Sequence, residues 1–258
     1  MLGAIAGDII GSVYERSPIK TEEFPLFSAG SVFTDDTVLT VACADGILTG
    51  REFSNTLREY YFRYPNAGYG ARFIRWANSE DPQPYNSWGN GSAMRVSPIG
   101  YAFDSLDQIL EESKKSAEVT HNHPEGIKGA QAVAAAIFLA RTGTSKEDIL
   151  LFIENRFQYS FSRSLDEIRP FYSFKSSCQD SVPEALQAFF ESVDFESAVR
   201  KAVSLGGDSD TQACIAGAVA EAYYEGVPSW IEQNCRKILP EELKGTIDNF
   251  AKKYIQTR

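Results

Sequence analysis

The chain has 258 residues, of which 43% are hydrophobic and 23% are charged. A globular chain of this size buries roughly 70 to 75% of its unfolded surface, so it can form a substantial core without disulfides or structural metals. The formal net charge of −10 opposes binding to a phosphate backbone, and no run of Lys or Arg offsets it locally. These properties argue against an extended nucleic-acid-binding surface. We expect one domain over residues 1–258.

The N-terminal residues are apolar, but they have no basic leader, and Asp8 interrupts the apolar run early. A signal peptide is therefore not expected. No uncharged apolar stretch approaches the ~20 residues that a membrane-spanning helix requires, so the sequence predicts no membrane role.

The four cysteines are far apart in the sequence and include no CxxC pair. Cys43 and Cys214 fall in Ala-rich helical runs, where a thiol behaves as a small apolar residue. With only two histidines in the chain, a closed structural zinc site is disfavoured. Reduced thiols in the core fit a cytoplasmic protein best.

Apolar residues recur at helical spacing along much of the chain, whereas alternating β-branched runs are scarce. The pattern predicts an all-α protein, with helices over residues 38–49, 104–117, 129–141, 145–155, 183–192, 194–204, 211–224 and 240–254. The helices over 129–140 and 211–222 are rich in Ala and Gly, which lets helix axes approach closely. We predict that these two form the centre of the bundle, and that the last helix packs over the surface with its charged face outward.

A first acidic cluster, Thr34-Asp35-Asp36-Thr37, stands directly before an apolar helical run. These residues therefore occupy the N-cap and first turn, where Thr and Asp are favoured by capping and by the helix dipole. Ordinary capping needs only one such side chain. Four consecutive oxygen-bearing residues are more than a cap requires.

A second cluster, Gly206-Gly207-Asp208-Ser209-Asp210-Thr211, also precedes a helix, and a loop with a cap is again the simpler interpretation. In a continuous helix Asp208 and Asp210 would point about 200° apart. A shared ligand requires them in an irregular entry to the helix, which the glycines permit because they tolerate positive φ.

Suppose that these four aspartates converge with Glu15. Two carboxylates ~5 Å apart repel by about 3 kcal/mol at an effective dielectric of ~20, so only cations hold such a cluster together in ionised form. Ligand sets made only of oxygen select magnesium, manganese or calcium over zinc or copper. Convergence would therefore create a site for hard divalent cations.

Four motifs occur in a characteristic order: GDxxGSxxE from Gly7 to Glu15, TDDT, GNGSAMR, and GGDSDT before an Ala-rich helix. From Gly3 to about Gly226 the chain resembles the ADP-ribosylglycohydrolases related to dinitrogenase reductase-activating glycohydrolase. The resemblance implies a compact orthogonal bundle of helices with a cleft that holds two magnesium or manganese ions.

The resemblance also assigns roles to the acidic residues. Metal ligands of the family fall on Thr34, Asp35, Asp36, Asp208, Asp210 and Thr211. The family glutamate falls on Glu15, which in relatives contacts the metal or moves away. We expect Glu15, Asp35 and Asp36 to be the catalytic residues, with Glu15 as the candidate for proton transfer.

Substrate contacts carry over less firmly. The family's glycine-bearing loop matches Ser87, Trp88, Gly89, Asn90 and Gly91, whose backbone N–H groups could bind pyrophosphate at a helix start. The simpler interpretation is a turn that feeds the helix beginning near Ser92.

Two further segments match positions near the substrate. Gly68, Tyr69 and Gly70 resemble a segment that lines the cleft, although they could simply be the entry to a helix. His121 matches a family position near the bound nucleotide. For His123, a structural role and a functional role are both open. The two histidines lack a third nitrogen or sulfur ligand for a transition metal.

The implied reaction cleaves the bond at the anomeric carbon of the ribose distal to adenosine. It releases ADP-ribose from an ADP-ribosylated protein, a nucleobase or a small molecule. One alternative is a non-catalytic ADP-ribose-binding or crystallin-like protein, which we would expect to have lost metal ligands; another is a dinuclear phosphohydrolase that releases AMP. The sequence leaves the acceptor, the choice between magnesium and manganese, and the oligomeric state open.

Overall fold

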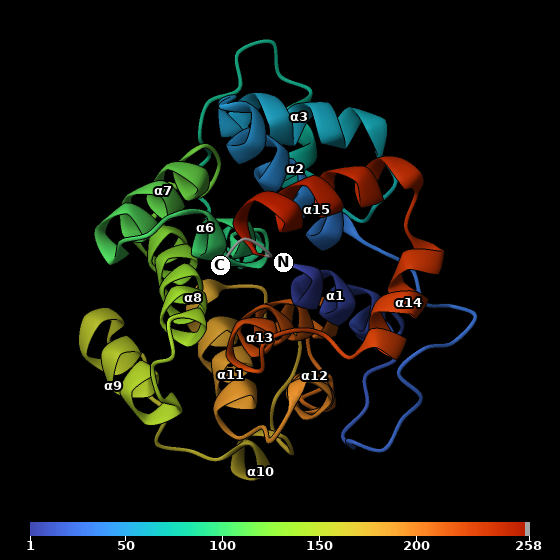
Figure 1. The fold of residues 1–258 in the computed structure, drawn as a ribbon, viewed down its shortest axis with the longest axis vertical. Coiled ribbons are helices and arrows are strands. Elements are labelled where there is room, and N and C mark those ends of the chain that lie inside the picture. Colours follow the sequence, from blue (N-terminus) through green and yellow to red (C-terminus); the bar gives the residue numbers. More distant parts are fainter. Residues whose placement is uncertain (256–258) are drawn as a thin grey trace.

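In the computed structural model, which describes residues 1–255, regular secondary structure is helical apart from one isolated bridge between Gly89 and Ser177 (Figure 1). The all-α prediction is confirmed. The helices are α1 (Leu2–Glu15), α2 (Asp35–Thr49), α3 (Phe53–Arg63), α4 (Ala71–Ala77), α5 (Gly91–Met94), α6 (Ser97–Ala102), α7 (Leu106–Glu118), α8 (Pro124–Arg141), α9 (Lys146–Phe157), α10 (Leu165–Ile168), α11 (Cys178–Phe190), α12 (Phe195–Ser204), α13 (Ser209–Tyr223), α14 (Ser229–Ile238) and α15 (Glu241–Tyr254).

Every helix predicted from periodicity is present, but α8 and α11 each begin five residues earlier than predicted. Helix α8 begins at Pro124, where the His123 side chain caps it by accepting a hydrogen bond from the Glu125 amide. Helix α11 begins at Cys178 and carries Pro183, the first residue of the predicted helix, in its interior. Helix α4 follows Gly70, in agreement with the simpler interpretation of that segment as a helix entry. Helices α1, α3, α6, α10 and α14 were not predicted from the sequence.

Helices α1 and α13 pack with their backbones in contact. Gly3, Gly7 and Gly11 form a stripe along α1, and a Cβ built on them would lie 2.3, 2.0 and 2.4 Å from carbonyl oxygens of α13. The prediction that α13 is central is confirmed, but its closest neighbour is α1 and not the predicted 129–140 helix. That helix contacts α13 as well, whereas its own Gly129 faces Cys178 of α11. The stripe sets the end of α1 beside the start of α13.

Gly7→Ala should therefore destabilise the protein by at least about 1 to 3 kcal/mol, because the new methyl group collides with the α13 backbone and the helices must separate. Gly245→Ala is the matched control, since Gly245 is exposed inside α15 with open space around it. The control should raise the free energy of unfolding by up to about 1 kcal/mol. Urea denaturation of both variants measures the difference, and equal stability would contradict the packing argument.

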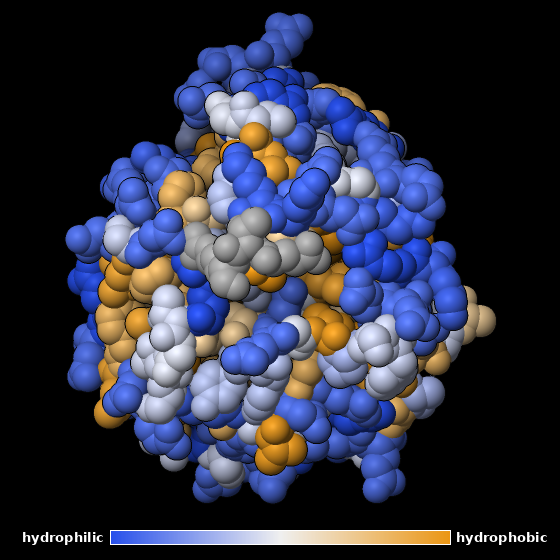
Figure 2. All heavy atoms as spheres, viewed as in Figure 1, coloured by the Kyte–Doolittle hydropathy of each residue, from blue (hydrophilic) through white to orange (hydrophobic). Residues whose placement is uncertain are grey.

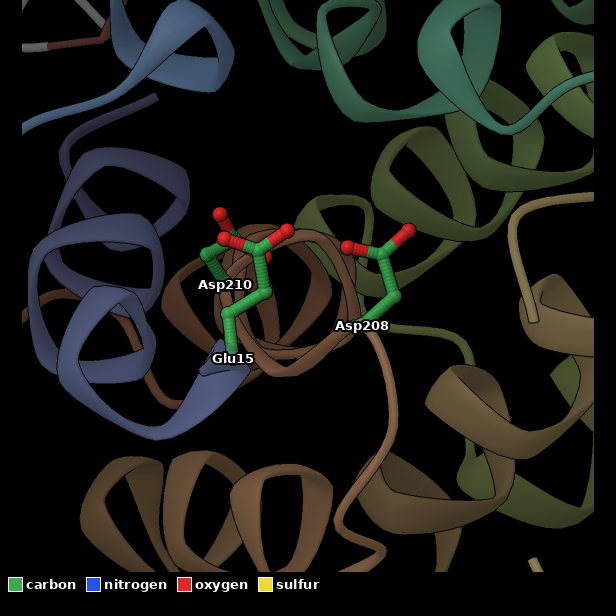
Figure 3. A group of neighbouring side chains, drawn as sticks. All are labelled: Glu15, Asp208 and Asp210. Carbon is green, nitrogen blue, oxygen red and sulfur yellow. The ribbon is translucent and has the colours of Figure 1, made fainter. Parts of the chain in front are cut away.

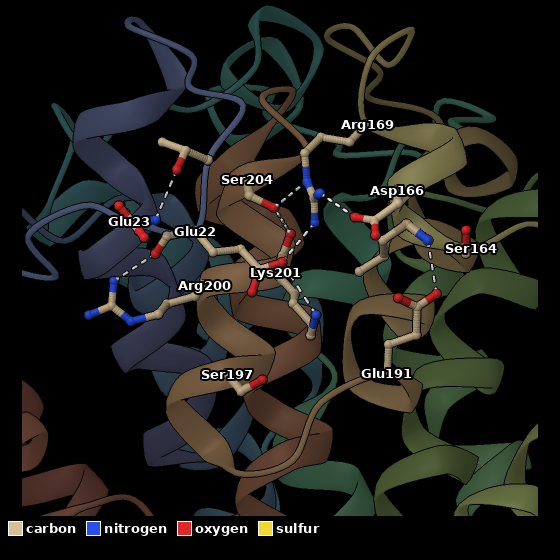
Figure 4. A network of polar contacts seen from close by, with 12 residues as sticks. Glu22, Glu23, Ser164, Asp166, Arg169, Glu191, Ser197, Arg200, Lys201 and Ser204 are labelled. Carbon is tan, nitrogen blue, oxygen red and sulfur yellow. Dashed lines mark hydrogen bonds and ion pairs between the residues drawn. The ribbon is translucent and has the colours of Figure 1, made fainter.

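The segment over residues 16–34 joins α1 to α2 and is tied to α12 (Figure 4). The Glu22 carboxylate accepts hydrogen bonds from Arg169 at 2.8 Å and from Lys201 at 3.3 Å. Arg200 donates to the carbonyl oxygens of Glu22 and Phe24 at 3.0 and 2.8 Å. These contacts fix the path by which the chain reaches the first acidic cluster.

The outer surface agrees with the predicted role of the last helix. Leu243, Ile247 and Phe250 of α15 are buried, while its charged side chains face outward, as predicted. Hydrophilic residues cover most of the face shown in Figure 2, and apolar side chains form small separate groups. Within residues 1–255, no helix is both long and apolar enough to span a membrane.

Candidate functional site

Glu15, Asp208 and Asp210 bring carboxylate oxygens within 4.8 Å of one another (Figure 3). Glu15 is the last residue of α1, Asp208 is the N-cap of α13, and Asp210 lies in its first turn. The predicted irregular entry to α13 is confirmed, since Asp208 has non-helical dihedral angles and Gly206 has a φ of +64°. The two aspartates and Glu15 therefore direct ligand atoms to one place, where they could hold a metal ion.

The first acidic cluster lies on the same cleft. Thr34 is the N-cap of α2, and its side chain accepts a hydrogen bond from the Asp36 amide, as predicted for this cluster. The Thr211 hydroxyl donates to Asp36 Oδ1 at 3.3 Å, which joins α13 to α2. Asp35 and Asp36 line the cleft together with Glu15, Asp208 and Asp210. Two clusters that are about 170 residues apart in the sequence thus line one cleft.

Burial makes ionisation of these acids unfavourable. It raises the pKa of Asp35 to about 8, with Asp8 as the next contributor. Burial and the neighbouring Asp210 raise the pKa of Asp36 well above its ordinary value, and burial with Asp208 does the same for Asp210. The pKa of Glu15 is raised by burial and then by Asp208. Positive charge placed among these acids would favour their ionised forms.

The donor set fits a hard divalent cation. Asp36 Oδ2 is buried and has no hydrogen-bond partner within residues 1–255, although a buried carboxylate oxygen normally has one. The surrounding donors are carboxylate and hydroxyl oxygens, the ligands that magnesium, manganese and calcium prefer. A bound cation would satisfy the free oxygen and remove the repulsion among the carboxylates.

Asp8 binds the start of α2 through hydrogen bonds and was not among the predicted site residues. Its buried carboxylate accepts hydrogen bonds from the Thr34 amide and hydroxyl, at 2.9 and 2.7 Å, and from the amide and hydroxyl of Thr37. It therefore fixes the start of α2. The sequence signal was its place in the GDxxGSxxE motif, seven residues before Glu15 and so on the same face of α1.

The cleft has a volume of about 760 Å³ and includes most of the predicted substrate residues. On its wall are Gly68, Gly70, Ser87, Gly89, Asn90, Gly91 and His121.

Two predicted side chains lie elsewhere. The Tyr69 ring is buried and stacks on Phe73, with 5.3 Å between the ring centroids. Trp88 is 46% exposed and its ring packs edge-on against His123, with centroids 5.5 Å apart. Neither Tyr69 nor Trp88 forms part of the cleft wall.

The loop over residues 87–91 differs from the predicted cradle of backbone amides. The Gly89 amide donates to Ser87 Oγ at 3.2 Å, and the Asn90 amide donates to the Ser176 carbonyl at 2.8 Å. These two amides are therefore already occupied, and the helix that follows, α5, is a single turn. The Asn90 side chain donates to Asp208 Oδ2 at 2.8 Å, so in this structure Asn90 positions an acid of the cluster.

Basic and aromatic side chains line another part of the cleft. Arg72 lies over the Tyr85 ring, with 5.2 Å between its guanidinium carbon and the ring centroid. Arg95 and His121 complete this wall. Burial lowers the pKa of His121 well below its ordinary value, and Arg95 and Arg72 lower it further. The cleft thus combines a carboxylate-rich region with a basic one. Neither Arg72 nor Arg95 was among the predicted site residues.

A model of the ADP-ribosylglycohydrolase family matches residues 1–258. The chain belongs to the ADP-ribosylglycohydrolase family. It is 28% identical to the chicken (Gallus gallus) ADP-ribosylhydrolase ARH3, with 91% of this chain and 87% of the relative covered. It is 29% identical to the ADP-ribosylarginine hydrolase Tri1 of Pseudomonas putida (strain GB-1), with 90% of this chain and 72% of the relative covered.

A solved structure described as an ADP-ribosylglycohydrolase-related protein complex has the same fold. It superposes with a TM-score of 0.76 at 25% identity, and covers 97% of this chain and 95% of the solved one. The family resemblance inferred from the motifs and the all-α family fold are therefore both confirmed.

Proposed function

We propose that the protein is a metal-dependent hydrolase that releases ADP-ribose by cleaving the bond at the anomeric carbon of the distal ribose. Family membership and the relatives named as ADP-ribosylhydrolases support ADP-ribosyl hydrolase activity. The observation that carries the proposal is the convergence of Glu15, Asp208 and Asp210 in a cleft also lined by Asp35 and Asp36.

Two magnesium or manganese ions would be held by the oxygen donors of both clusters. The proposed ligands are Thr34, Asp35, Asp36, Asp208, Asp210 and Thr211, with Glu15 beside them. When bound, such ions polarise the oxygens that they contact and lower the pKa of water. Asp8 and Asn90 support this arrangement, because they hold Thr34 and Asp208 in place.

Glu15 is the proposed group for proton transfer. Glycosidic bonds of this kind break through an oxocarbenium-like transition state, in which the leaving atom gains a proton and the attacking water loses one. Glu15 is less buried than Asp208 and Asp210, and its raised pKa keeps a proton available closer to neutral pH. Glu15 is the last residue of α1, from which its carboxyl group would give or take a proton beside the proposed metal site.

The proposed substrates are an ADP-ribosylated protein, an ADP-ribosylated nucleobase and a small molecule such as O-acetyl-ADP-ribose. The ADP-ribose-binding and crystallin-like alternatives are less well supported, since every proposed ligand is present and the two clusters share a cleft. A dinuclear phosphohydrolase would use the same donors but would release AMP.

We also infer a cytoplasmic location. Cys43, Cys178, Cys214 and Cys235 are all buried free thiols, as expected of a protein that functions in a reducing compartment.

Mass spectrometry of the products tests the reaction directly. We expect free ADP-ribose from at least one member of a panel of ADP-ribosylated acceptors when magnesium or manganese is present, and none in chelator. Retained ADP-ribose binding without product from any acceptor would favour the binding-protein alternative. AMP in place of ADP-ribose would identify the phosphohydrolase.

A further inference from the structure

Within residues 1–255, the buried Arg95 forms no ion pair with an acidic side chain. Its side chain has 0% exposure, and its Nη2 donates to the Ser116 carbonyl at 2.8 Å and to the Thr120 hydroxyl at 2.9 Å. Its Nε and Nη1 are buried and have no partner within residues 1–255. A buried guanidinium without a carboxylate beside it is energetically costly. Arg95 therefore lies beside the cleft for a reason other than neutralising an acid.

The contact between Arg95 and Thr120 determines which hydrogen bonds the threonine hydroxyl can accept and donate. A guanidinium only donates hydrogen bonds, so Thr120 Oγ1 accepts from Arg95. The same oxygen lies 2.7 Å from His121 Nδ1. Thr120 is fully buried, so its hydroxyl proton needs an acceptor within the protein. Within residues 1–255 the hydrogen-bond partners of Oγ1 are Arg95 and His121, so His121 Nδ1 is the group that accepts the threonine proton.

His121 Nε2 lies on the side of the ring that faces the glycine loop. A Cβ built on Gly91 would lie 3.2 Å from Nε2, and one built on Gly89 would lie 3.5 Å from it. All three residues line the cleft. The amides of Gly89 and Asn90 already have acceptors, so a proton on Nε2 would add a hydrogen-bond donor beside the loop.

We propose that Arg95 and Thr120 are positioning residues that fix His121 as the tautomer with its proton on Nε2. In this form His121 donates a hydrogen bond to a phosphate oxygen of the substrate diphosphate. The nearby guanidinium groups of Arg72 and Arg95 add positive charge, which favours an anionic acceptor over a neutral one. The recognition step rests on the proposed function, whereas the tautomer is a property of the free protein.

Nitrogen-15 NMR of the free, full-length protein tests the tautomer. The chain contains only two histidines, so a His123→Gln variant suffices to assign the signals. We expect a protonated Nε2 and an unprotonated Nδ1 for His121 in the wild type and in Thr120→Ser, which keeps the hydroxyl. Thr120→Val removes the hydroxyl at similar volume and should lose this signature. A proton on Nδ1 in the wild type would overturn the proposal even if Thr120→Val does not fold.

Binding and kinetics test the recognition step. Thr120→Val should weaken ADP-ribose binding by about 10-fold, and Thr120→Ser should restore it to near wild type. For a substrate that the wild type cleaves, KM should rise with kcat nearly unchanged, because the contact is remote from the reacting carbon. Unchanged ADP-ribose affinity in Thr120→Val, despite an altered tautomer, would refute the recognition step. Failure of the proposed hydrolase function would appear separately, as a wild type that forms no product.

Discussion

Replacing Glu15 with Gln is expected to lower turnover about 100-fold or more while leaving divalent-cation affinity largely intact. The amide keeps the size of the carboxyl group but cannot transfer a proton. Glu15 is also less buried than Asp208 and Asp210, and the aspartates would still hold the cations. The measurements are kcat from released ADP-ribose and magnesium or manganese affinity by titration calorimetry.

Asp210→Asn provides the contrast, because Asp210 is buried in the first turn of α13 and is proposed as a ligand. It should weaken cation binding first, with turnover partly restored at high metal concentration. Undiminished affinity in Asp210→Asn would refute its role as a ligand. Parallel losses of affinity and turnover in Glu15→Gln would show that Glu15 holds the metal rather than moving a proton.

The acidic clusters were predictable because each lies next to a helix start that sets its local geometry. Capping chemistry placed Thr34, Asp35 and Asp36 at the entry to α2, and glycine flexibility gave Asp208 and Asp210 a common direction at the entry to α13. Their convergence could not follow from spacing alone. It depends on the packing of α1 against α13, which was overlooked because the stripe of Gly3, Gly7 and Gly11 was not interpreted as a helix interface.

Side-chain direction in loops was the least predictable part of the site. Matching motifs located Gly68–Gly70 and the 87–91 loop correctly beside the cleft, but periodicity does not determine where a ring in an irregular segment points. Tyr69 turns into an aromatic cluster, and Trp88 turns toward His123. The Asn90 amide bonds to the Ser176 carbonyl, which only the tertiary fold brings close, and the same is true of the contact between Arg95 and Thr120.

The metal-free protein is expected to lose stability as pH rises from about 4 to about 8. The folded-state pKa values of the clustered acids are raised, to about 8 for Asp35, whereas unfolded aspartates titrate near 3.9. Between these values the unfolded chain binds fewer protons than the native protein, so increasing pH favours unfolding. Each such group lowers the free energy of unfolding by up to about 1.4 kcal/mol per pH unit. The corresponding fall in Tm is about 3 to 5 °C per pH unit and group for a chain of this size.

Magnesium should reverse this dependence, because a cation that binds the ionised carboxylates removes the benefit of keeping them protonated. The Tm difference between magnesium and chelator should therefore grow from pH 5 to pH 8 in thermal unfolding. Asp35→Asn should flatten the slope in chelator, whereas Asp107→Asn, an exposed change of equal charge on α7, should leave it unaltered. A Tm in chelator that is constant between pH 5 and 8 would mean that the clustered acids are ionised without a cation. The carboxylate repulsion from which we infer the metal site would then be compensated by the protein itself.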